Sequence, residues 1–438
     1  MWRHTIPAIW VPEAALCDLG DDRPGAASGY NTLVAATPAN AATAASPFES
    51  GLVRKTLAGW FLSGVLSSFL GAILTVWRYH LTEDFLIVGH FFLAMNVGIL
   101  AAVPLWRYVL PRRNLSLALA CGCGIACGSL LFLAALSPAT LFWWRMAGIA
   151  GIGCGNGLLN LALFQALTPV YRMNPSASLS LSGTFFGLGC AVTALLVAGT
   201  FFMYTVPSIL VFIAALPGYG AGIYAIGRLK TPEEPGPSSF RRRLGEFRTP
   251  AAVLLALLLF FQFGNEWAIA GWLPLFLTRR VGASPEGALI LLAVYWLALV
   301  VGRVVVLSIL PVVSHARLLG ASILAALFGC TILFSTNNRF GATAGVLLVG
   351  AGFASVYPLV AEKIGKRFPN YQPSFYSGIF CLGMTGGMLA PWSLGLFANV
   401  WGIRVAMVLP VFGSVMVFLL VLAIWAETKY SFSVQSRI

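Results

Sequence analysis

The chain has 438 residues, of which 59% are hydrophobic and only 9% are charged, and its net charge is +13. Soluble globular proteins carry about 25% charged and about 45–50% apolar residues, so this composition excludes a soluble enzyme. It also excludes disorder for most of the chain, because disorder needs low hydrophobicity. We therefore expect an all-α polytopic membrane protein.

The N-terminal segment differs from the rest, because it is rich in Ala, Pro, Gly, Thr, Asn and Asp. Such a composition cannot bury enough apolar surface to fold, and we predict a disordered cytoplasmic tail over residues 1–55. The segment also lacks the basic start and the clean apolar run of a signal peptide.

Twelve apolar runs follow, each close to the roughly 20 residues that a helix needs to cross a bilayer. Their continuous apolar character excludes a β-barrel, whose strands are short and alternating. We predict twelve transmembrane helices at Thr56–Val76, Phe85–Pro104, Ser116–Leu136, Leu141–Leu167, Ser178–Thr200, Ser208–Ile226, Ala251–Leu277, Gly287–Leu310, Leu318–Ser335, Gly341–Ala361, Phe375–Phe397 and Ile403–Trp425.

A polar segment rich in Pro, Ser and Arg divides these helices into two equal sets. We predict a cytoplasmic linker over residues 228–250, between six-helix bundles at 56–227 and 251–425, with a short cytoplasmic tail at 426–438. Two six-helix bundles around a central cytoplasmic loop are the layout of a duplicated transporter, whose site lies between the halves.

Basic residues set the orientation. Of the 27 Lys and Arg residues, 20 fall on the side of the two termini, five fall on the other side and two lie within spans. Cytoplasmic loops carry the excess of Lys and Arg, so we predict a multi-pass protein of the cell membrane with both termini cytoplasmic. The positive charge is therefore expected to face membrane lipids, and no nucleic-acid partner is expected.

Span 4 carries Arg145, Asn156 and Asn160. The spacings of eleven and four residues place all three on one helix face. Amides offer paired donors and acceptors, which would suit a sugar or polyol. They could equally form hydrogen bonds between helices, and Arg145 lies close enough to the outer boundary to reach the interface.

Span 7 contains the one acidic residue that lies deep in an apolar run, Glu266, preceded by Gln262 and Asn265. A deep carboxylate is costly and is a functional candidate by default. The low dielectric penalises its charged form, which suits a group that takes up and releases a proton. A permanently paired structural Glu is the alternative interpretation.

Aromatic residues near these positions include Trp272 in span 7 and Trp296 in span 8. Trp296 lies about 14 Å into its span, too deep for an interfacial anchor, so either packing or a sugar-stacking role remains open. Glycines recur in spans 4, 5 and 11, and their spacing predicts close packing of helices.

Enzymatic chemistry is not expected. The chain has no G-x-x-x-x-G-K-[ST] nucleotide-binding loop, and one deep acid without a deep His or a second acid makes a poor active site. We expect no cofactor and no metal site. A transport-dead sensor would need a large output domain, for which the tail is too small.

The layout and the motifs resemble the major facilitator superfamily. Arg145 followed by spaced glycines in span 4 is similar to its Arg-then-glycine motif, and Gly302-Arg303 is similar to the conserved Gly-Arg pair near the cytoplasmic end of span 8. A finer resemblance, to the fucose, galactose and glucose:proton symporter branch, rests on four stretches: Gly264-Asn265-Glu266 with Gly271-Trp272-Leu273-Pro274, Tyr295-Trp296, Gly350-Ala351-Gly352 with Tyr357-Pro358, and Gly183 to Gly189.

The resemblance implies a secondary transporter that works by alternating access around a cavity lined by spans 1, 4, 7 and 10. Fucose permease-like proteins use carboxylates in spans 1 and 4, and this chain has serines and amides there. We therefore expect a transporter of a small polar solute, such as a sugar, in which Glu266 couples transport to a proton or sodium. We also expect the protein to be a monomer. The alternative from the same superfamily is an efflux carrier for an amphipathic compound.

Overall fold

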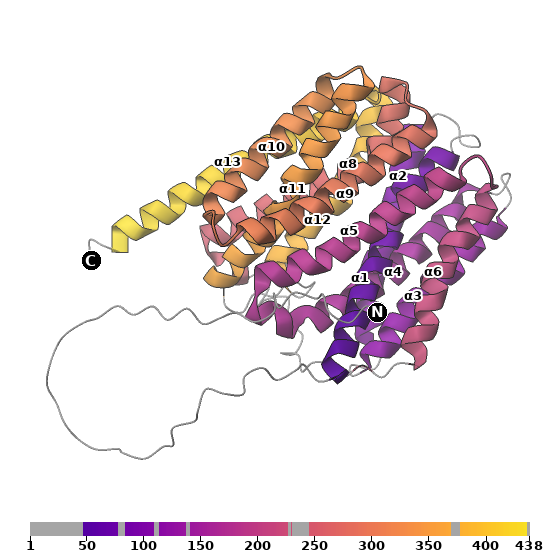
Figure 1. Ribbon diagram of the computed structural model, residues 1–438, viewed down its shortest axis with the longest axis horizontal. Helices are drawn as coiled ribbons and strands as arrows, with labels where there is room; N and C mark the ends of the chain where they lie inside the picture. The colour runs from indigo at the N-terminus through magenta and orange to yellow at the C-terminus, as the bar shows by residue number, and fades with distance from the viewer. Residues whose placement is uncertain are drawn as a thin grey trace, which may run out of the picture. The chain divides into compact units, whose positions relative to one another are not determined.

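The structure is a computed structural model, and it describes residues 47–77, 84–108, 114–136, 141–226, 229, 245–368 and 377–435. Most of the predicted tail (1–55) and most of the predicted linker (228–250) lie outside these residues. The described part contains twelve helices long and apolar enough to cross a membrane (Figure 1): α1 (Pro47–Trp77), α2 (Phe85–Tyr108), α3 (Leu115–Ala135), α4 (Phe142–Met173), α5 (Pro175–Thr200), α6 (Val206–Ile226), α8 (Pro250–Phe276), α9 (Pro285–Ile309), α10 (His315–Ser335), α11 (Arg339–Arg367), α12 (Gly378–Trp401) and α13 (Val405–Gln435).

The twelve predicted spans are confirmed, because each overlaps one of these helices. The ends differ by a few residues, and several helices run further than their apolar cores. The helix α11 continues to Arg367, and α8 passes into a π-helical turn, η2 (Leu277–Val281). That turn ends at Gly282, whose φ of 68° suits a residue without a β-carbon.

Polar residues placed before the apolar runs explain several helix starts. The side chains of Asn114, Asn174, Ser284 and Asn338 each accept a hydrogen bond from a backbone N–H in the first turn of α3, α5, α9 and α11. A capping oxygen satisfies one of the free N–H groups of a helix start and typically contributes about 1 kcal/mol. These caps fix where the membrane helices begin.

The packing of the first six helices, the N-half, is repeated in the last six, the C-half. In the N-half α1 packs on α5, α2 on α4, and α3 on both α4 and α6. In the C-half α8 packs on α12, α9 on α11, and α10 on both α11 and α13. The main helix pairs are therefore the same in the two halves, as expected for an internal structural repeat.

The halves meet through two equivalent contacts. The fifth helix of each half packs against the second helix of the other, so that α5 lies along α9 and α12 lies along α2. Additional contacts join α1 with α8 and α5 with α11.

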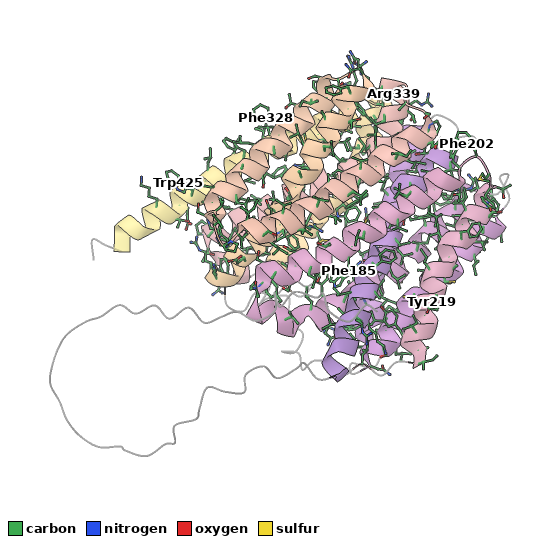
Figure 2. The ribbon with its side chains drawn as sticks, in the orientation of Figure 1. Phe185, Phe202, Tyr219, Phe328, Arg339 and Trp425 are labelled. Atoms are coloured by element: carbon green, nitrogen blue, oxygen red, sulfur yellow. The ribbon has the colours of Figure 1, made fainter. Side chains whose placement is uncertain are left out.

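Burial separates inner from outer helices. In α1, α4, α8 and α11, between 67% and 78% of the most apolar window is buried, against 33–39% in α3, α6, α10 and α13. Figure 2 shows Phe202, Tyr219, Phe328 and Trp425 projecting from the outside of the helices, and all four are largely exposed. Exposed aromatic and aliphatic side chains on apolar helices are expected where the surrounding solvent is lipid.

The predicted glycine packing is confirmed. A β-carbon on Gly155 would lie 2.5 Å from the carbonyl oxygen of Gly122 on α3, and a β-carbon on Gly383 would lie 2.7 Å from the β-carbon of Leu259 on α8. Distances this short leave no room for a side chain, so small residues allow the helix backbones to approach.

The helices alternate in direction, which gives the bundle two ends. The terminal face is defined here by the start of α1 and the end of α13, together with the ends of α2, α4, α6, α9 and α11. The opposite face carries the ends of α1, α3, α5, α8, α10 and α12. The 20-to-5 distribution of basic residues predicts that the terminal face is cytoplasmic.

Candidate functional site: a cavity between the two halves

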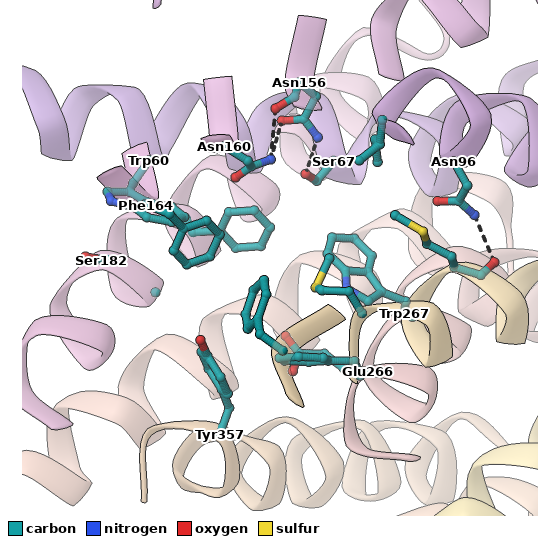
Figure 3. Close-up of a pocket in the computed structure, with 18 of the residues that line it drawn as sticks. Trp60, Ser67, Asn96, Asn156, Asn160, Phe164, Ser182, Glu266, Trp267 and Tyr357 are labelled. Atoms are coloured by element: carbon teal, nitrogen blue, oxygen red, sulfur yellow. Dashed lines mark hydrogen bonds between the residues drawn. The ribbon is translucent and has the colours of Figure 1, made fainter. Parts of the chain in front are cut away.

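A cavity of about 170 Å³ lies between the N-half and the C-half (Figure 3). It is lined from eight helices and combines polar side chains with many rings. The lining residues are Trp60, Ser67, Phe92, Met95, Asn96, Ile99, Asn156, Asn160, Phe164, Leu179, Ser182, Gly183, Phe186, Phe263, Glu266, Trp267, Arg303, Tyr357, Phe380, Met384, Gly387, Met388 and Pro391.

Two oppositely charged residues meet on the C-half side of the cavity. Glu266 of α8 and Arg303 of α9 are only 6% and 5% exposed, and Arg303 Nη2 lies 3.9 Å from Glu266 Oε1. This distance is longer than a hydrogen bond, so the two charges attract without a close contact. The pair is the one ion pair among the described residues that line the cavity.

Arg303 also touches the N-half. Its guanidinium lies against Gly183 of α5, and a β-carbon at position 183 would overlap the Nη1 atom. Gly183 therefore makes room for the Arg303 head group, and Arg303 links α9 to both α8 and α5. The Nε and Nη1 atoms of Arg303 are buried and have no hydrogen-bond partner.

On the N-half side, two amides form a network with α1. Asn156 Nδ2 donates to Ser67 Oγ at 2.8 Å, and Asn160 Nδ2 donates to Asn156 Oδ1 at 3.1 Å. Ser63 Oγ lies within hydrogen-bond distance of the Oδ1 atoms of both amides, at 3.1 and 2.9 Å. Figure 3 shows part of this network at the cavity wall. The amides thus join α1 to α4 and also line the cavity.

Aromatic rings form much of the remaining wall. Phe186 packs edge-on against Trp267, and Phe164 packs against Phe380, with ring centroids 6.0 and 5.2 Å apart. These contacts pair a ring from the N-half with a ring from the C-half. The hydroxyl of Tyr357 points toward the cavity in Figure 3 and has no hydrogen-bond partner, and the Nε1 atom of Trp60 also has none.

Backbone contacts bring the halves together on the opposite-face side of the cavity. A β-carbon on Gly395 of α12 would lie 2.6 Å from the Cα atom of Gly89 on α2, and a β-carbon on Gly71 of α1 would overlap the carbonyl oxygen of Ala270 on α8. Close by, Asn96 Nδ2 donates to the carbonyl oxygen of Met388 at 2.9 Å.

On the terminal-face side, side chains make the contacts between the halves. Tyr171 of α4 donates a 3.1 Å hydrogen bond to the carbonyl oxygen of Ala361 on α11. The ring pair of Phe164 and Phe380 lies nearer to the cavity. The halves therefore touch at both ends of the cavity, through a close approach of glycine backbone at one end and a hydrogen bond from a tyrosine hydroxyl at the other.

Several residues predicted from the sequence lie elsewhere. Gln262 and Asn265 do not line the central cavity but a small void toward α10, α11 and α13. The Asn265 amide packs on Gly413 and donates a long hydrogen bond of 3.4 Å to Ser414 Oγ. Both residues contribute to packing inside the C-half, and their role in binding a solute stays a prediction.

The two predicted tryptophans lie behind the wall. Trp296 is fully buried and packs edge-on against Phe186 and Trp267, which do line the cavity. Trp272 stacks on Phe92 and donates a 2.9 Å hydrogen bond to the carbonyl oxygen of Pro391. Both residues support lining residues and do not themselves face the cavity.

The predicted motif residues separate in space. Arg145 lines a different cavity of about 540 Å³, formed with the end of α1 and the segment between α5 and α6, so it does not join Asn156 and Asn160. A β-carbon on Gly302 would lie 2.7 Å from the β-carbon of Ala354, so Gly302 serves the contact between α9 and α11. Arg303 is the motif residue that reaches the central cavity.

The cavity also uses residues that sequence reasoning did not select. The predicted helices 1, 4, 7 and 10 correspond to α1, α4, α8 and α11, and all four contribute. Four further helices contribute as well: α2, α5, α9 and α12. Leu179 and Ser182 of α5 and Met384 and Met388 of α12 are small or apolar residues within apolar runs, so no sequence signal distinguishes them from packing residues.

Solved structures of transporters have the same overall fold. A fucose transporter of the major facilitator superfamily, solved in its outward conformation, matches with a TM-score of 0.59 at 17% identity, over 86% of this chain and 99% of that chain. A nucleoside transporter matches with a TM-score of 0.63 at 13% identity, over 86% and 99% of the two chains. A bacterial homologue of the human lysosomal transporter Spinster, inward-facing and unoccupied, matches with 0.62 at 15% identity, over 87% and 98%.

At the level of sequence, the chain is 27% identical over 171 residues to an uncharacterised transporter of the major facilitator type from Yersinia pestis. That match spans 39% of this chain and 43% of the relative. No family model matches the chain. The proteins described above are transporters, and the predicted resemblance to the superfamily, with a fucose transporter among the similar structures, is confirmed.

Proposed function

Because the chain has the fold of the major facilitator superfamily, we propose that it is a secondary active transporter that moves a small polar solute across a membrane by alternating access. The observation that carries this proposal is the cavity itself. It lies between two repeated six-helix halves and holds a buried Glu266–Arg303 pair on one wall and the Asn156–Asn160 amides on the other. Sites between repeated halves are the usual place of substrate binding in such folds.

Alternating access requires contacts that break at one end while those at the other end persist. The contact between Gly89 and Gly395 and the hydrogen bond from Tyr171 to Ala361 lie on opposite sides of the cavity. Rocking of the halves would separate one of these contacts at a time. The cavity would then open in turn to the opposite face and to the terminal face.

The proposed solute is a sugar or a similar small polar molecule. Amide and hydroxyl groups of Asn156, Asn160 and Ser67 line one wall, and rings such as Trp267 and Phe186 line another. Rings pack against the C–H faces of a sugar while polar groups bind its hydroxyls. One of the similar structures is a fucose:proton symporter of E. coli, which supports this class of solute.

Glu266 is the proposed coupling residue, and it would bind a proton or sodium. It is the one acidic residue among the described residues that line the cavity, and it is almost fully buried. A carboxylate at mid-membrane is costly and is retained where it has a function. Loading an ion on Glu266 together with the solute would couple solute movement to an ion gradient.

A second candidate is an efflux carrier for an amphipathic compound. The specific observation in its favour is the number of rings and methionines in the wall, among them Phe164, Phe380, Met384 and Met388. Such apolar walls suit an amphipathic ligand as well as the face of a sugar. The direction of flux under an imposed pH gradient separates the two functions.

We further propose that the protein lies in the cell membrane with its terminal face in the cytoplasm, as a monomer. The excess of basic residues on the side of the termini supports this orientation. Reporter fusions at the C-terminus test it directly. A cytoplasmic reporter such as green fluorescent protein is expected to be active there, and activity of a periplasmic reporter would contradict the orientation.

The decisive experiment is counterflow in proteoliposomes. Purified protein is reconstituted with an excess of unlabelled solute inside, and uptake of the labelled solute is followed for a panel of sugars, sugar acids and polyols. At least one member is expected to show transient accumulation that protein-free liposomes lack. A panel with no counterflow would contradict transport of a small polar solute.

A further inference from the structure

The buried guanidinium of Arg303 has hydrogen-bonding capacity that the protein leaves unused. Arg303 is 5% exposed and lines the central cavity, and its Nε and Nη1 atoms have no hydrogen-bond partner. Buried polar groups are almost always paired, and an unpaired charged donor is especially costly. A cavity wall that contains an incompletely paired guanidinium suits a ligand that accepts hydrogen bonds and carries negative charge.

Glu266 compensates this charge only loosely. Its Oε1 atom is 3.9 Å from Arg303 Nη2, beyond hydrogen-bond distance. Three other ionisable side chains lie around Glu266, namely Tyr295 from α9, Tyr357 from α11 and Cys190 from α5. None of these three is charged at neutral pH in its ordinary form. The charge of the cavity is therefore decided by Glu266, Arg303 and whatever binds there.

Counting charges gives two states in which the cavity is neutral. The first is the empty cavity with Glu266 ionised and Arg303 charged. The second is the cavity with Glu266 protonated, Arg303 charged and a monoanion bound. A proton without an anion leaves a net positive charge in a low-dielectric site, and an anion without a proton leaves a net negative charge, and both are unfavourable.

We propose that the transported solute is a small hydroxylated monocarboxylate that binds Arg303 as an anion, and that one proton binds Glu266 in the same step. This inference rests on the proposed transport function and specifies its solute class. No covalent bond changes. The proton converts the Glu266 carboxylate into a carboxylic acid, which releases Arg303 to the carboxylate of the solute.

The size and the remaining donors of the cavity fit such a solute. A cavity of about 150 Å³ holds benzene, so the observed 170 Å³ suits one six-membered ring with small substituents. The unpartnered Tyr357 hydroxyl, which points toward the cavity in Figure 3, can bind a hydroxyl on the ring. The rings of Trp267 and Phe186 can cover its faces.

Coupling follows from the same charge balance. Because the empty and the fully loaded states are both neutral, reorientation of either moves no net charge across the membrane. Transport is therefore electroneutral, with one proton per monoanion. A partly loaded carrier would have to move a buried, uncompensated charge, which suppresses leakage of either partner alone.

The first test compares matched solutes in proteoliposome counterflow. Glucuronate is paired with glucose, and 4-hydroxybenzoate is paired with 4-hydroxybenzyl alcohol, so that the members of each pair differ in the carboxylate. We expect counterflow of at least one carboxylate and an apparent affinity about tenfold or more above that of its neutral partner, as a charge-assisted hydrogen bond implies. Equal or better transport of the neutral partners overturns the inference.

The second test replaces Arg303. Arg303→Gln is expected to lower the apparent affinity for the carboxylate by about tenfold or more and to lower the affinity for the neutral partner much less, while Arg303→Lys recovers part of the loss. Arg404→Gln is the matched control, because Arg404 is exposed at the turn before α13. An equal response of anionic and neutral solutes to Arg303→Gln contradicts the proposal.

The third test measures charge movement. A pH gradient, acidic outside, is expected to drive accumulation of the carboxylate, and a potassium diffusion potential at equal pH is expected to leave accumulation unchanged. A response to the potential contradicts electroneutral transport. If neutral solutes exchange and carboxylates do not, the proposal of an anionic solute fails, but the proposed transport function stands. If neither kind of solute exchanges, both proposals fail.

Discussion

Tyr171 of α4 donates a hydrogen bond of 3.1 Å to the carbonyl oxygen of Ala361 on α11, and both residues are buried. The bond connects the N-half to the C-half on the terminal-face side of the cavity. Its counterpart on the other side is the approach of Gly89 to Gly395. The two ends are therefore held by different kinds of contact, and they are expected to respond differently to substitution.

Removing the Tyr171 hydroxyl is expected to favour opening toward the terminal face. A neutral hydrogen bond contributes about 1 kcal/mol, so Tyr171→Phe should raise the open population about fivefold. Hydrogen exchange of peptides from the ends of α4 and α11 measures this. Tyr224→Phe is the control, because the Tyr224 hydroxyl donates to the carbonyl oxygen of Lys55 within the N-half. Equal exchange in the two variants would refute the assignment.

A side chain at Gly395 is expected to keep the opposite face from closing. The β-carbon of Gly395→Ala would lie 2.6 Å from Gly89 Cα, a distance that backbone atoms cannot relieve without moving apart. We expect a fall in transport rate of about tenfold or more, with the protein still folded and monodisperse. Gly128→Ala is the control, since nothing lies within 4 Å of its added carbon. Normal transport by Gly395→Ala would show that this contact is dispensable.

Neutralising Glu266 is expected to separate coupling from exchange. Glu266→Gln keeps the size of the side chain and removes its ability to carry a proton, so accumulation driven by an ion gradient should fail while solute exchange survives. Uptake with and without an imposed gradient distinguishes the two activities. Glu286→Gln, at the start of α9, is the matched control. Unchanged gradient-driven accumulation in Glu266→Gln would end the role assigned to this carboxylate.

The amide network is expected to contribute unequally to stability. Asn156 is within hydrogen-bond distance of Ser63 and Ser67 on α1, whereas Asn160 reaches Ser63 alone on that helix. Hydrogen bonds between membrane helices average about 0.6 kcal/mol, so Asn156→Ala should lower the thermal unfolding midpoint more than Asn160→Ala. The reverse order, measured in detergent, would show that Asn160 is the main structural amide.

The helices were predictable because length and hydrophobicity leave a membrane-spanning chain few alternatives. An apolar run of about 20 residues in a bilayer must satisfy its own backbone, and a helix does so. The position of Glu266 was predictable for a related reason, since a single acid within such a run stands out against its neighbours. Helix ends were less certain, as at α11, because polar residues extend the helix beyond the apolar core.

The pairing of Glu266 with Arg303 in the cavity wall was not predictable from one sequence. Residue spacing gives the depth of a side chain along its own helix, but the direction it faces depends on how that helix rotates against its neighbours. The sequence therefore identified Arg303 only as part of a motif near the end of a span. Its proximity to Glu266 depends on how α9 packs against α8. Asn265 precedes Glu266 directly, yet a turn of about 100° per residue directs it toward α13.

The meeting of Gly89 and Gly395 has a consequence for how this protein can diversify. A junction made of main chain offers mutation almost nothing to adjust, since any added atom collides. The walls of the cavity, by contrast, consist of exchangeable side chains. Under the proposed transport function, a change of solute is therefore expected to come from substitutions in the walls, whereas a substitution at this junction is expected to disturb how the halves close.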